Sequence, residues 1–133
     1  MALVHLAILL ALLEFIVFVM AVGKARGTYA VPAPATSGHE VFERYFRVQM
    51  NTLEQLVVFV PAILLFGAYV HPLVAAALGL VFVIGRWLYF RGYVKDPKKR
   101  EMGFMLSAVP NVILLLGGLI GIVRVLLMHP NGG

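Results

Sequence analysis

The sequence contains no cysteine. It therefore cannot form a disulfide, a zinc–thiolate site or an iron–sulfur cluster, and no thiol of its own can act as a nucleophile. Charged residues are also scarce, at 13% of 133 residues, against about 25% in an ordinary soluble domain. So few charges argue against a soluble enzyme, a disordered chain and a coiled coil.

What the chain has instead of charge is apolar side chain. Hydrophobic residues make up 62% of the sequence, and the mean hydropathy is +0.95. The length suits one domain, and a single small core cannot bury this much apolar surface. The remainder is expected to face lipid, which indicates an integral membrane protein.

Four stretches are long enough to cross the hydrocarbon as helices, which takes about 20 mostly apolar residues each. No stretch has the alternating pattern of a membrane-barrel strand. We therefore predict an all-α integral membrane protein with four transmembrane helices, forming a single domain over residues 1–133. With their polar extensions, the expected helices cover residues 2–23, 40–70, 73–94 and 101–126.

The basic residues predict how the chain is oriented. The net charge is +5, and ten of the eleven Lys and Arg residues lie in or beside the first and third loops, while only Arg124 lies on the other side. The positive-inside rule makes those loops cytoplasmic and places both termini outside. We find no eukaryotic retention signal, which favours a bacterial inner membrane. The first span lacks the basic start of a signal peptide and is expected to remain in the mature protein.

Polar residues form a stripe where the second helix enters the membrane. Arg47, Asn51 and Glu54 are four and three residues apart, which places them on one helical face. Gln49 lies near them but is rotated away from the stripe. The stripe could be an internal salt-bridge set between helices. It could equally hold a ligand, because arginine pairs with carboxylates and a glutamate can hold an ammonium group.

A second stripe lies at the end of the third helix, on the same side of the membrane. Arg86, Tyr89 and Tyr93 share a face, and Arg26 and Arg100 lie at the same level on the first and fourth helices. The tyrosines could be interfacial belt residues, and the arginines could simply reach lipid headgroups. Taken together, the two stripes are suited to a zwitterion with several carboxylates, such as a small peptide.

Glu14 is the one charged residue near the middle of the first span. We interpret it as a packing residue or a neutral contact with another helix. A transport pathway would carry polar residues through the full depth of the membrane. Because the polar residues gather at one boundary, the pattern argues against a transporter.

Two runs of sequence resemble signatures of the MAPEG family, the membrane-associated proteins in eicosanoid and glutathione metabolism. Residues 42–55 match the helix-two pattern E-R-x-x-R-x-x-x-N-x-x-E, and residues 85–93 match the helix-three pattern R-x-x-Y-x-x-x-Y. Arg100, seven residues further on, matches another arginine of the family. The resemblance covers nearly the whole chain and is greatest to the branch of the type-three microsomal glutathione transferase and leukotriene-C synthase.

The resemblance implies a homotrimer of four-helix bundles, with glutathione bound between neighbouring protomers near the cytoplasmic boundary. In that arrangement Arg26 and Arg47 suit the carboxylates of glutathione and Glu54 suits its amino group. Arg100 faces the sulfur as the catalytic residue. The implied glutathione ligands are Arg26, Arg47, Gln49, Asn51, Glu54, Tyr89 and Tyr93.

The implied activity is that of a membrane glutathione transferase, with glutathione as co-substrate and no metal. A cation beside the sulfur favours the thiolate, which would attack a lipophilic electrophile or reduce a lipid hydroperoxide. Membrane lipid is the other expected partner, and nucleic acid is not expected. The alternative is a non-catalytic scaffold or lipid-binding protein with the same fold, although the family's non-catalytic member lacks the arginine that this chain has as Arg100.

The sequence departs from the eicosanoid branch of the family at three positions. Gln55 stands where that branch has a tyrosine, Val57 where it has a proline, and Gly27 where it has a second arginine. One hydroxyl contact to glutathione is therefore missing, and leukotriene synthesis is not the expected reaction.

Overall fold

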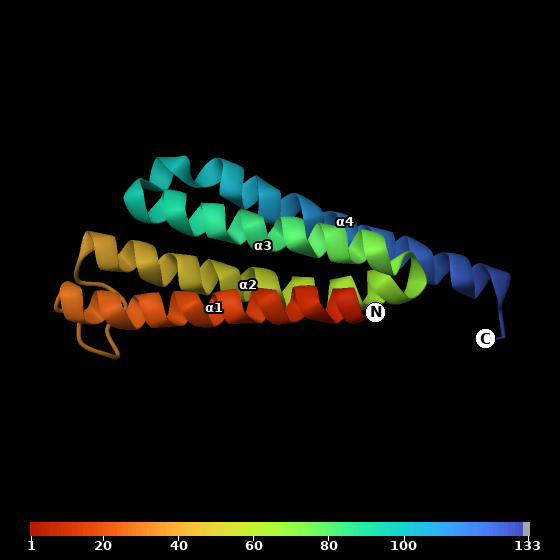
Figure 1. Cartoon of the computed structure of the whole chain (residues 1–133), viewed down its shortest axis with the longest axis horizontal. Coiled ribbons are helices and arrows are strands. Elements are labelled where there is room, and N and C mark those ends of the chain that lie inside the picture. The colour runs from red at the N-terminus through yellow and green to blue at the C-terminus, as the bar shows by residue number, and fades with distance from the viewer. Residues whose placement is uncertain (132–133) are drawn as a thin grey trace.

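A computed structural model describes residues 1–131 of the chain, which fold into four long helices (Figure 1). All four are long and apolar enough to cross a membrane, and residues 1–131 contain no strand. The prediction of an all-α protein with four membrane-spanning helices is therefore confirmed. The elements are α1 (Ala2–Thr28), α2 (Glu40–Tyr69), α3 (Pro72–Lys95), the short 3₁₀ helix η1 (Pro97–Arg100) and α4 (Glu101–Met128).

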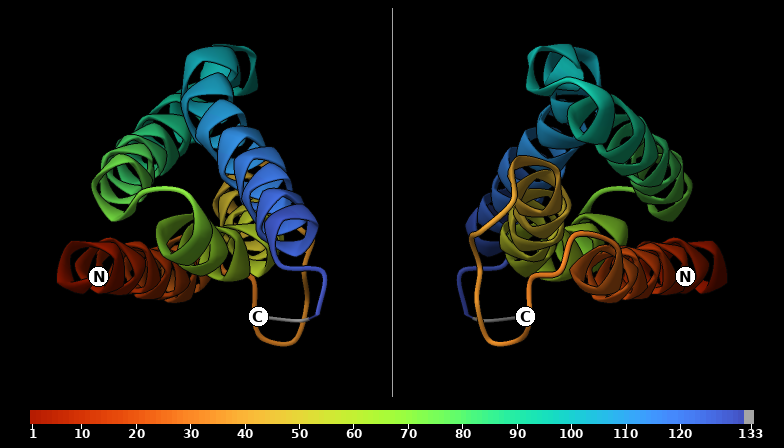
Figure 2. Two further views of the ribbon diagram at one scale, coloured as in Figure 1. Left: turned by 90° about the vertical axis from the view of Figure 1, so that its right-hand side faces the viewer. Right: turned by 90° about the vertical axis from the view of Figure 1, so that its left-hand side faces the viewer.

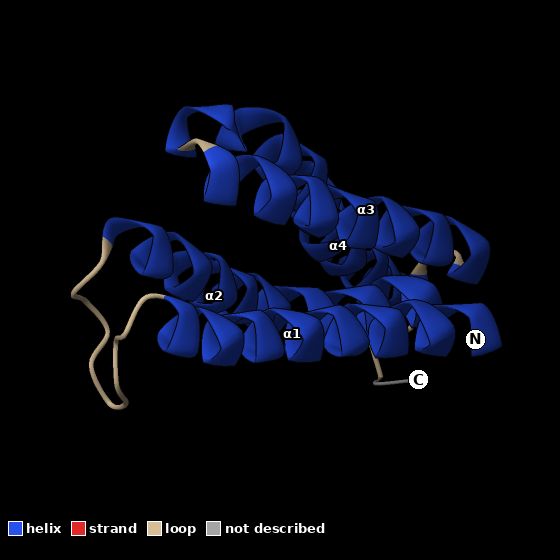
Figure 3. Ribbon diagram, turned by 60° about the vertical axis from the view of Figure 1, so that its left-hand side comes forward, coloured by secondary structure: helices blue, strands red, loops and turns tan. Residues whose placement is uncertain are grey.

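The helices run lengthwise beside one another, so the connections gather at the two ends of the bundle (Figure 1). The α1–α2 and α3–α4 connections lie at one end, which we call the loop end. The N-terminus, the α2–α3 turn and the end of α4 lie at the other. Toward the loop end the α1–α2 pair diverges from the α3–α4 pair (Figures 2 and 3). The two connections in or beside which most of the basic residues lie therefore share one end.

The helix ends follow from short capping signals. In the α2–α3 turn, His71 Nδ1 accepts hydrogen bonds from the backbone N–H groups of Leu73 and Val74, at 3.2 and 3.3 Å, and Pro72 opens α3. At the loop end, the Asp96 carboxylate accepts from the Lys98 N–H at 3.1 Å and starts η1. That cap fixes how the chain enters α4.

Helix α1 continues to Thr28, past the end expected at residue 23. The apolar stretch does stop near Val22, but the residues that follow it, including Lys24, Ala25 and Arg26, are good helix formers. A polar extension of α1 therefore continues beyond the apolar part of the span.

Helices α3 and α4 approach one another closely because glycines stand at their contact. A Cβ atom on Gly85 would lie 2.6 Å from the backbone of Leu106, and one on Gly103 would collide with the backbone of Tyr89. Small residues of this kind let membrane helices pack backbone against backbone. The contact sets the position of the start of α4 relative to the end of α3.

Candidate functional site

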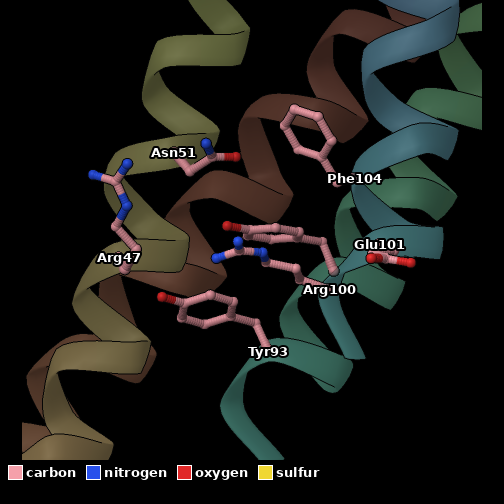
Figure 4. Close-up of a pocket in the computed structure, with 7 residues that line it drawn as sticks. Arg47, Asn51, Tyr93, Arg100, Glu101 and Phe104 are labelled. Atoms are coloured by element: carbon pink, nitrogen blue, oxygen red, sulfur yellow. The ribbon is translucent and has the colours of Figure 1, made fainter. Parts of the chain in front are cut away.

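A pocket of about 290 Å³ opens between α2, α3 and α4 near the loop end (Figure 4). Five of the eight predicted site residues line it, namely Arg47, Asn51, Tyr89, Tyr93 and Arg100. Glu101 and Phe104, which the sequence did not single out, complete the lining.

The pocket has two walls of different origin. Arg47 and Asn51 come from α2, and Tyr93 comes from the end of α3 (Figure 4). The guanidinium of Arg100 and the hydroxyl of Tyr93 point across the pocket toward α2, while the Glu101 carboxylate points away from it. The rings of Tyr89 and Tyr93 are stacked, with centroids 5.5 Å apart. Cationic and hydroxyl donors therefore face one cavity.

Behind the pocket lies a fully enclosed arginine. The Arg86 side chain is 0% exposed, and its Nη2 donates to Asn51 Oδ1 at 2.8 Å and to Thr52 Oγ1 at 3.0 Å. Its Nη1 donates to Ser107 Oγ at 3.1 Å, and its Cζ lies 4.3 Å from the centre of the Tyr89 ring. We call Arg86, Asn51, Thr52, Ser107 and Tyr89 the Arg86 cluster.

The Arg86 cluster joins three helices and positions two of the residues that line the pocket. Because Asn51 uses its oxygen to accept from Arg86, its Nδ2 group is left as a hydrogen-bond donor for the pocket. Arg86 lies over the Tyr89 ring and restrains its position. Arg86 therefore shares a helical stripe with the tyrosines, as its spacing predicts, but it does not line the cavity.

Arg100 is in the opposite situation. Its side chain is exposed, and within residues 1–131 its guanidinium has no hydrogen-bond or ion-pair partner. An arginine keeps its charge under all physiological conditions. The pocket therefore contains a permanent cation that the folded protomer itself does not neutralise.

The structure does not bring the other three predicted residues into this pocket. Arg26 donates to the backbone oxygens of Ala35 at 2.7 Å and Val31 at 3.4 Å, and so holds the first loop. Gln49 is half-buried elsewhere on α2, and Glu54 lies outside the lining.

Glu54 nevertheless lies close to the rim of the pocket. Its carboxylate is 4.0 Å from the guanidinium of Arg47, and the two side chains are 58% and 56% exposed. An exposed pair at this distance contributes little to stability, roughly 0–1 kcal/mol. Both charges can therefore rearrange toward a ligand at small cost.

Gln55, one of the three positions that depart from the eicosanoid branch, joins α2 to α4. The Gln55 side-chain oxygen accepts from Asn111 Nδ2 at 3.0 Å, and the backbone oxygen of Gln55 accepts from the same nitrogen at 3.1 Å. Gln55 does not line the pocket. In this chain the position serves helix packing.

The sequence-based prediction did not include Thr52, Glu101, Phe104 or Ser107. A signal for two of them was present, because Arg100, Phe104 and Ser107 repeat the four-and-three spacing of the other stripes. Thr52 had no such signal, because it lies one residue beyond Asn51 and reaches the cluster only through Arg86.

Glu14 of α1 does not line the pocket. It is half-buried, and its Oε1 atom has no hydrogen-bond partner within residues 1–131. Among residues 1–131, no group of three or more His, Asp or Glu residues could hold a metal ion.

The chain is similar in sequence to a protein family and to several known proteins. A profile described as "MAPEG family" matches residues 2–120. An uncharacterized protein of Synechocystis, sll1147, is 48% identical over 113 residues, covering 85% of this chain and 82% of its own. Human microsomal glutathione S-transferase 2 is 44% identical over 79% of this chain and 71% of its own. Rat leukotriene C4 synthase is 36% identical over 74% of this chain and 66% of its own.

Proposed function

Because the chain belongs to the MAPEG family, we propose that the pocket binds glutathione and that the protein is a membrane-bound glutathione transferase or glutathione-dependent peroxidase. The relatives with assigned names are a glutathione transferase and leukotriene C4 synthase. The single observation that carries the proposal is the unpaired guanidinium of Arg100, which points into a pocket lined by Arg47, Asn51 and Tyr93.

The chemistry needs a thiolate, and the chain has no cysteine to supply one. A thiol becomes a strong nucleophile only when it loses its proton. A permanent cation beside the sulfur of glutathione stabilises the anion and lowers the pKa of that thiol. Arg100 is suited to this role and unsuited to being the base, so the proton leaves to water at the membrane boundary.

The two candidate reactions differ only in the atom that the thiolate attacks. With an electrophilic carbon, an S–C bond forms and the leaving group departs with its electron pair. With a hydroperoxide, the sulfur takes the terminal oxygen, the O–O bond breaks, and an alcohol and a sulfenic acid result. A second glutathione then reduces the sulfenic acid, giving the disulfide and water. In both cases the pocket would hold the bound thiolate in position for an apolar reactant that arrives from the bilayer.

For the remaining predicted ligands, we infer that a second copy of the chain completes the site. Glu54 shares a face with Arg47 and can reach a ligand that extends beyond the pocket. Gln49 lies on the opposite face of α2, so one ligand cannot meet Arg47 and Gln49 of the same protomer. We infer that the Gln49 and Arg26 ligand positions are supplied by a neighbouring protomer, in the homotrimer that the family resemblance implies.

The distribution of the basic residues gives an orientation. The first and third connections lie at one end of the bundle (Figure 1), and most of the positive charge lies in or beside them, as does the pocket. We propose that this end is cytoplasmic. We assign the protein to a bacterial inner membrane, with glutathione arriving from the cytoplasm and the second substrate from the bilayer.

The proposal is tested on the purified protein in detergent. Glutathione is titrated by calorimetry, and turnover is then measured with an aryl halide electrophile and with a lipid hydroperoxide. Arg100→Ala is compared with Arg124→Ala, which removes one positive charge at the other end of the bundle. Conjugate or alcohol that forms with Arg124→Ala but not with Arg100→Ala supports the proposal. Glutathione binding without either product would instead favour the scaffold alternative. No glutathione binding would contradict the assignment of the pocket to glutathione and, with it, both candidate reactions.

A further inference from the structure

A second hollow lies at the loop end, on a different face of α3 from the candidate pocket. It consists of two adjoining cavities of about 340 and 290 Å³, which share Tyr45 and Phe90. The candidate pocket uses Tyr89 and Tyr93 of α3, whereas this hollow uses the neighbouring face of that helix. We call it the basic groove; it is lined by α1, α2 and α3. The residues that line it include Ala21, Lys24, Tyr45, Phe90, Arg91 and Lys95.

The floor of the basic groove is apolar and held in place by aromatic packing. The Phe90 ring lies 4.9 Å from that of Phe18, 5.4 Å from that of Trp87 and 5.9 Å from that of Tyr45, measured between centroids. Ala21 and Val94 add small and aliphatic surface to the same floor. A groove with this floor accepts glycerol and the first methylenes of an acyl chain better than it accepts a free ion.

The rim of the basic groove is cationic. Lys24, Arg91 and Lys95 are all exposed, and none of their side chains has a hydrogen-bond or ion-pair partner within residues 1–131. No aspartate or glutamate is among the residues that line the groove. The adjacent Arg44 is different, because it pairs with Glu40 at 2.9 Å and donates to the backbone oxygens of Val94 and Lys95.

The depth of the basic groove matches the headgroup region. Lys24 lies in the polar extension of α1, and Lys95 is the last residue of α3. In a bundle whose four helices cross a membrane, these positions lie at the boundary between hydrocarbon and water. Basic residues at this level attract anionic lipid, and the apolar floor adds a contact that diffuse attraction lacks.

We propose that the basic groove is a binding site for one anionic glycerophospholipid. The three cations of Lys24, Arg91 and Lys95 hold the headgroup phosphate, and the glycerol and upper acyl chain lie along Phe90 and Ala21. This site is separate from the glutathione pocket, and it does not depend on the proposed reaction.

The test is native mass spectrometry of the full-length protein in detergent, with added dioleoyl phosphatidylglycerol or dioleoyl phosphatidylcholine. We expect one phosphatidylglycerol per chain to stay bound under conditions that remove phosphatidylcholine. The variant Lys24→Ala/Arg91→Ala/Lys95→Ala should retain phosphatidylglycerol about tenfold more weakly or worse. Its matched control is Lys98→Ala/Lys99→Ala/Arg124→Ala, which removes three positive charges outside the groove and should retain the lipid.

A second variant tests the groove without altering its charge. Ala21→Trp fills the floor and should displace the lipid while every cation remains. Helical circular dichroism and thermal unfolding confirm that each variant is folded, and glutathione binding is not needed for either readout. Equal loss in the two triple variants, equal retention of both lipids, or full retention in Ala21→Trp would each overturn the proposal. So would displacement of the lipid by inorganic phosphate at equal concentration, since the site would then recognise the anion alone.

Discussion

Two arginines at the loop end of the bundle have the same charge and opposite surroundings. Arg86 is fully enclosed, and Asn51, Thr52 and Ser107 accept its hydrogen bonds. Arg100, the last residue of η1 and the N-cap of α4, has an exposed side chain and no partner within residues 1–131. Both terminal nitrogens of Arg86 are thus paired within the fold, although its buried Nε has no partner within residues 1–131, whereas the guanidinium of Arg100 is left for a ligand. The difference separates the part of the site that holds the helices together from the part that we propose acts on glutathione.

The largest effect on stability should come from removing the guanidinium at the centre of the Arg86 cluster. Arg86→Met leaves two buried hydroxyls, of Thr52 and Ser107, and the half-buried amide of Asn51 without their donor, and each buried unsatisfied group costs about 1–3 kcal/mol. We expect the free energy of unfolding to fall by roughly 3 kcal/mol or more. The measurement is unfolding in mixed detergent micelles, followed by circular dichroism. Arg100→Ala is the control and should change stability by no more than about 0.5 kcal/mol. If the two variants were equally stable, the contrast between the two arginines would be wrong.

The next largest effect should come from the contact that positions both arginines. Gly103→Ala places a Cβ atom against the backbone of Tyr89, and overpacking of this kind costs about 1–3 kcal/mol. We expect a lower midpoint of thermal unfolding and weaker glutathione binding together, because α4 must move away from α3. Gly23→Ala is the matched control, since an added Cβ there has no neighbour within 4 Å. A Gly103→Ala protein that unfolds like Gly23→Ala would show that the α3–α4 contact is looser than described.

The sequence was sufficient to predict the four spans and to place two polar stripes at one end of the bundle, where five of the eight predicted site residues line one pocket. These features follow from the length of the apolar stretches and from helical spacing, which depend only on residues within one segment. Arg47 and Asn51, four residues apart on one helix, are an example. Which side chains of different helices contact one another cannot be predicted from spacing within a single helix. Nothing in the spacing of Arg86, Tyr89 and Tyr93 shows that the first is enclosed and the last is open. That depends on Gly85 and Gly103, which bring α4 close enough for Ser107 to meet Arg86.

Arg26 and Gln49 show a second limit of the sequence. Spacing places Gln49 away from the stripe of Arg47, and no pattern within one chain says which copy a ligand would meet. The family resemblance named both as ligands, and the single protomer keeps both outside the pocket. Their role therefore stays a prediction that depends on the assembly.

A smaller effect is expected at the exposed rim of the pocket, where a substitution should weaken glutathione binding without lowering stability. Glu54→Ala removes one member of an exposed pair, so its stability should stay within about 0.5 kcal/mol of the parent. If Glu54 holds the ammonium group of glutathione, the dissociation constant should rise about tenfold, which is about 1.4 kcal/mol. Calorimetry with glutathione measures this directly. Unchanged affinity would remove Glu54 from the site.

The smallest effect on turnover should come from removing one hydroxyl of the Arg86 cluster. Ser107→Ala removes one acceptor of Arg86 while Asn51 and Thr52 remain. We expect a loss of about 1–3 kcal/mol in unfolding free energy, because Nη1 of the enclosed Arg86 is left without an acceptor. Turnover per bound glutathione should be nearly unchanged, because Ser107 does not line the pocket. A large loss of turnover with normal stability would mean that Ser107 takes part in the reaction.

The central claim is that Arg100 is left unpaired in order to stabilise the thiolate of glutathione. Its most direct test is a pH titration of bound glutathione, followed by thiolate absorbance in the ultraviolet, in the parent protein and in Arg100→Ala. We predict a thiolate band near neutral pH in the parent and a shift of that band to higher pH in the variant, with glutathione still bound. An Arg100→Ala protein that binds glutathione and shows the same thiolate titration as the parent would contradict the account.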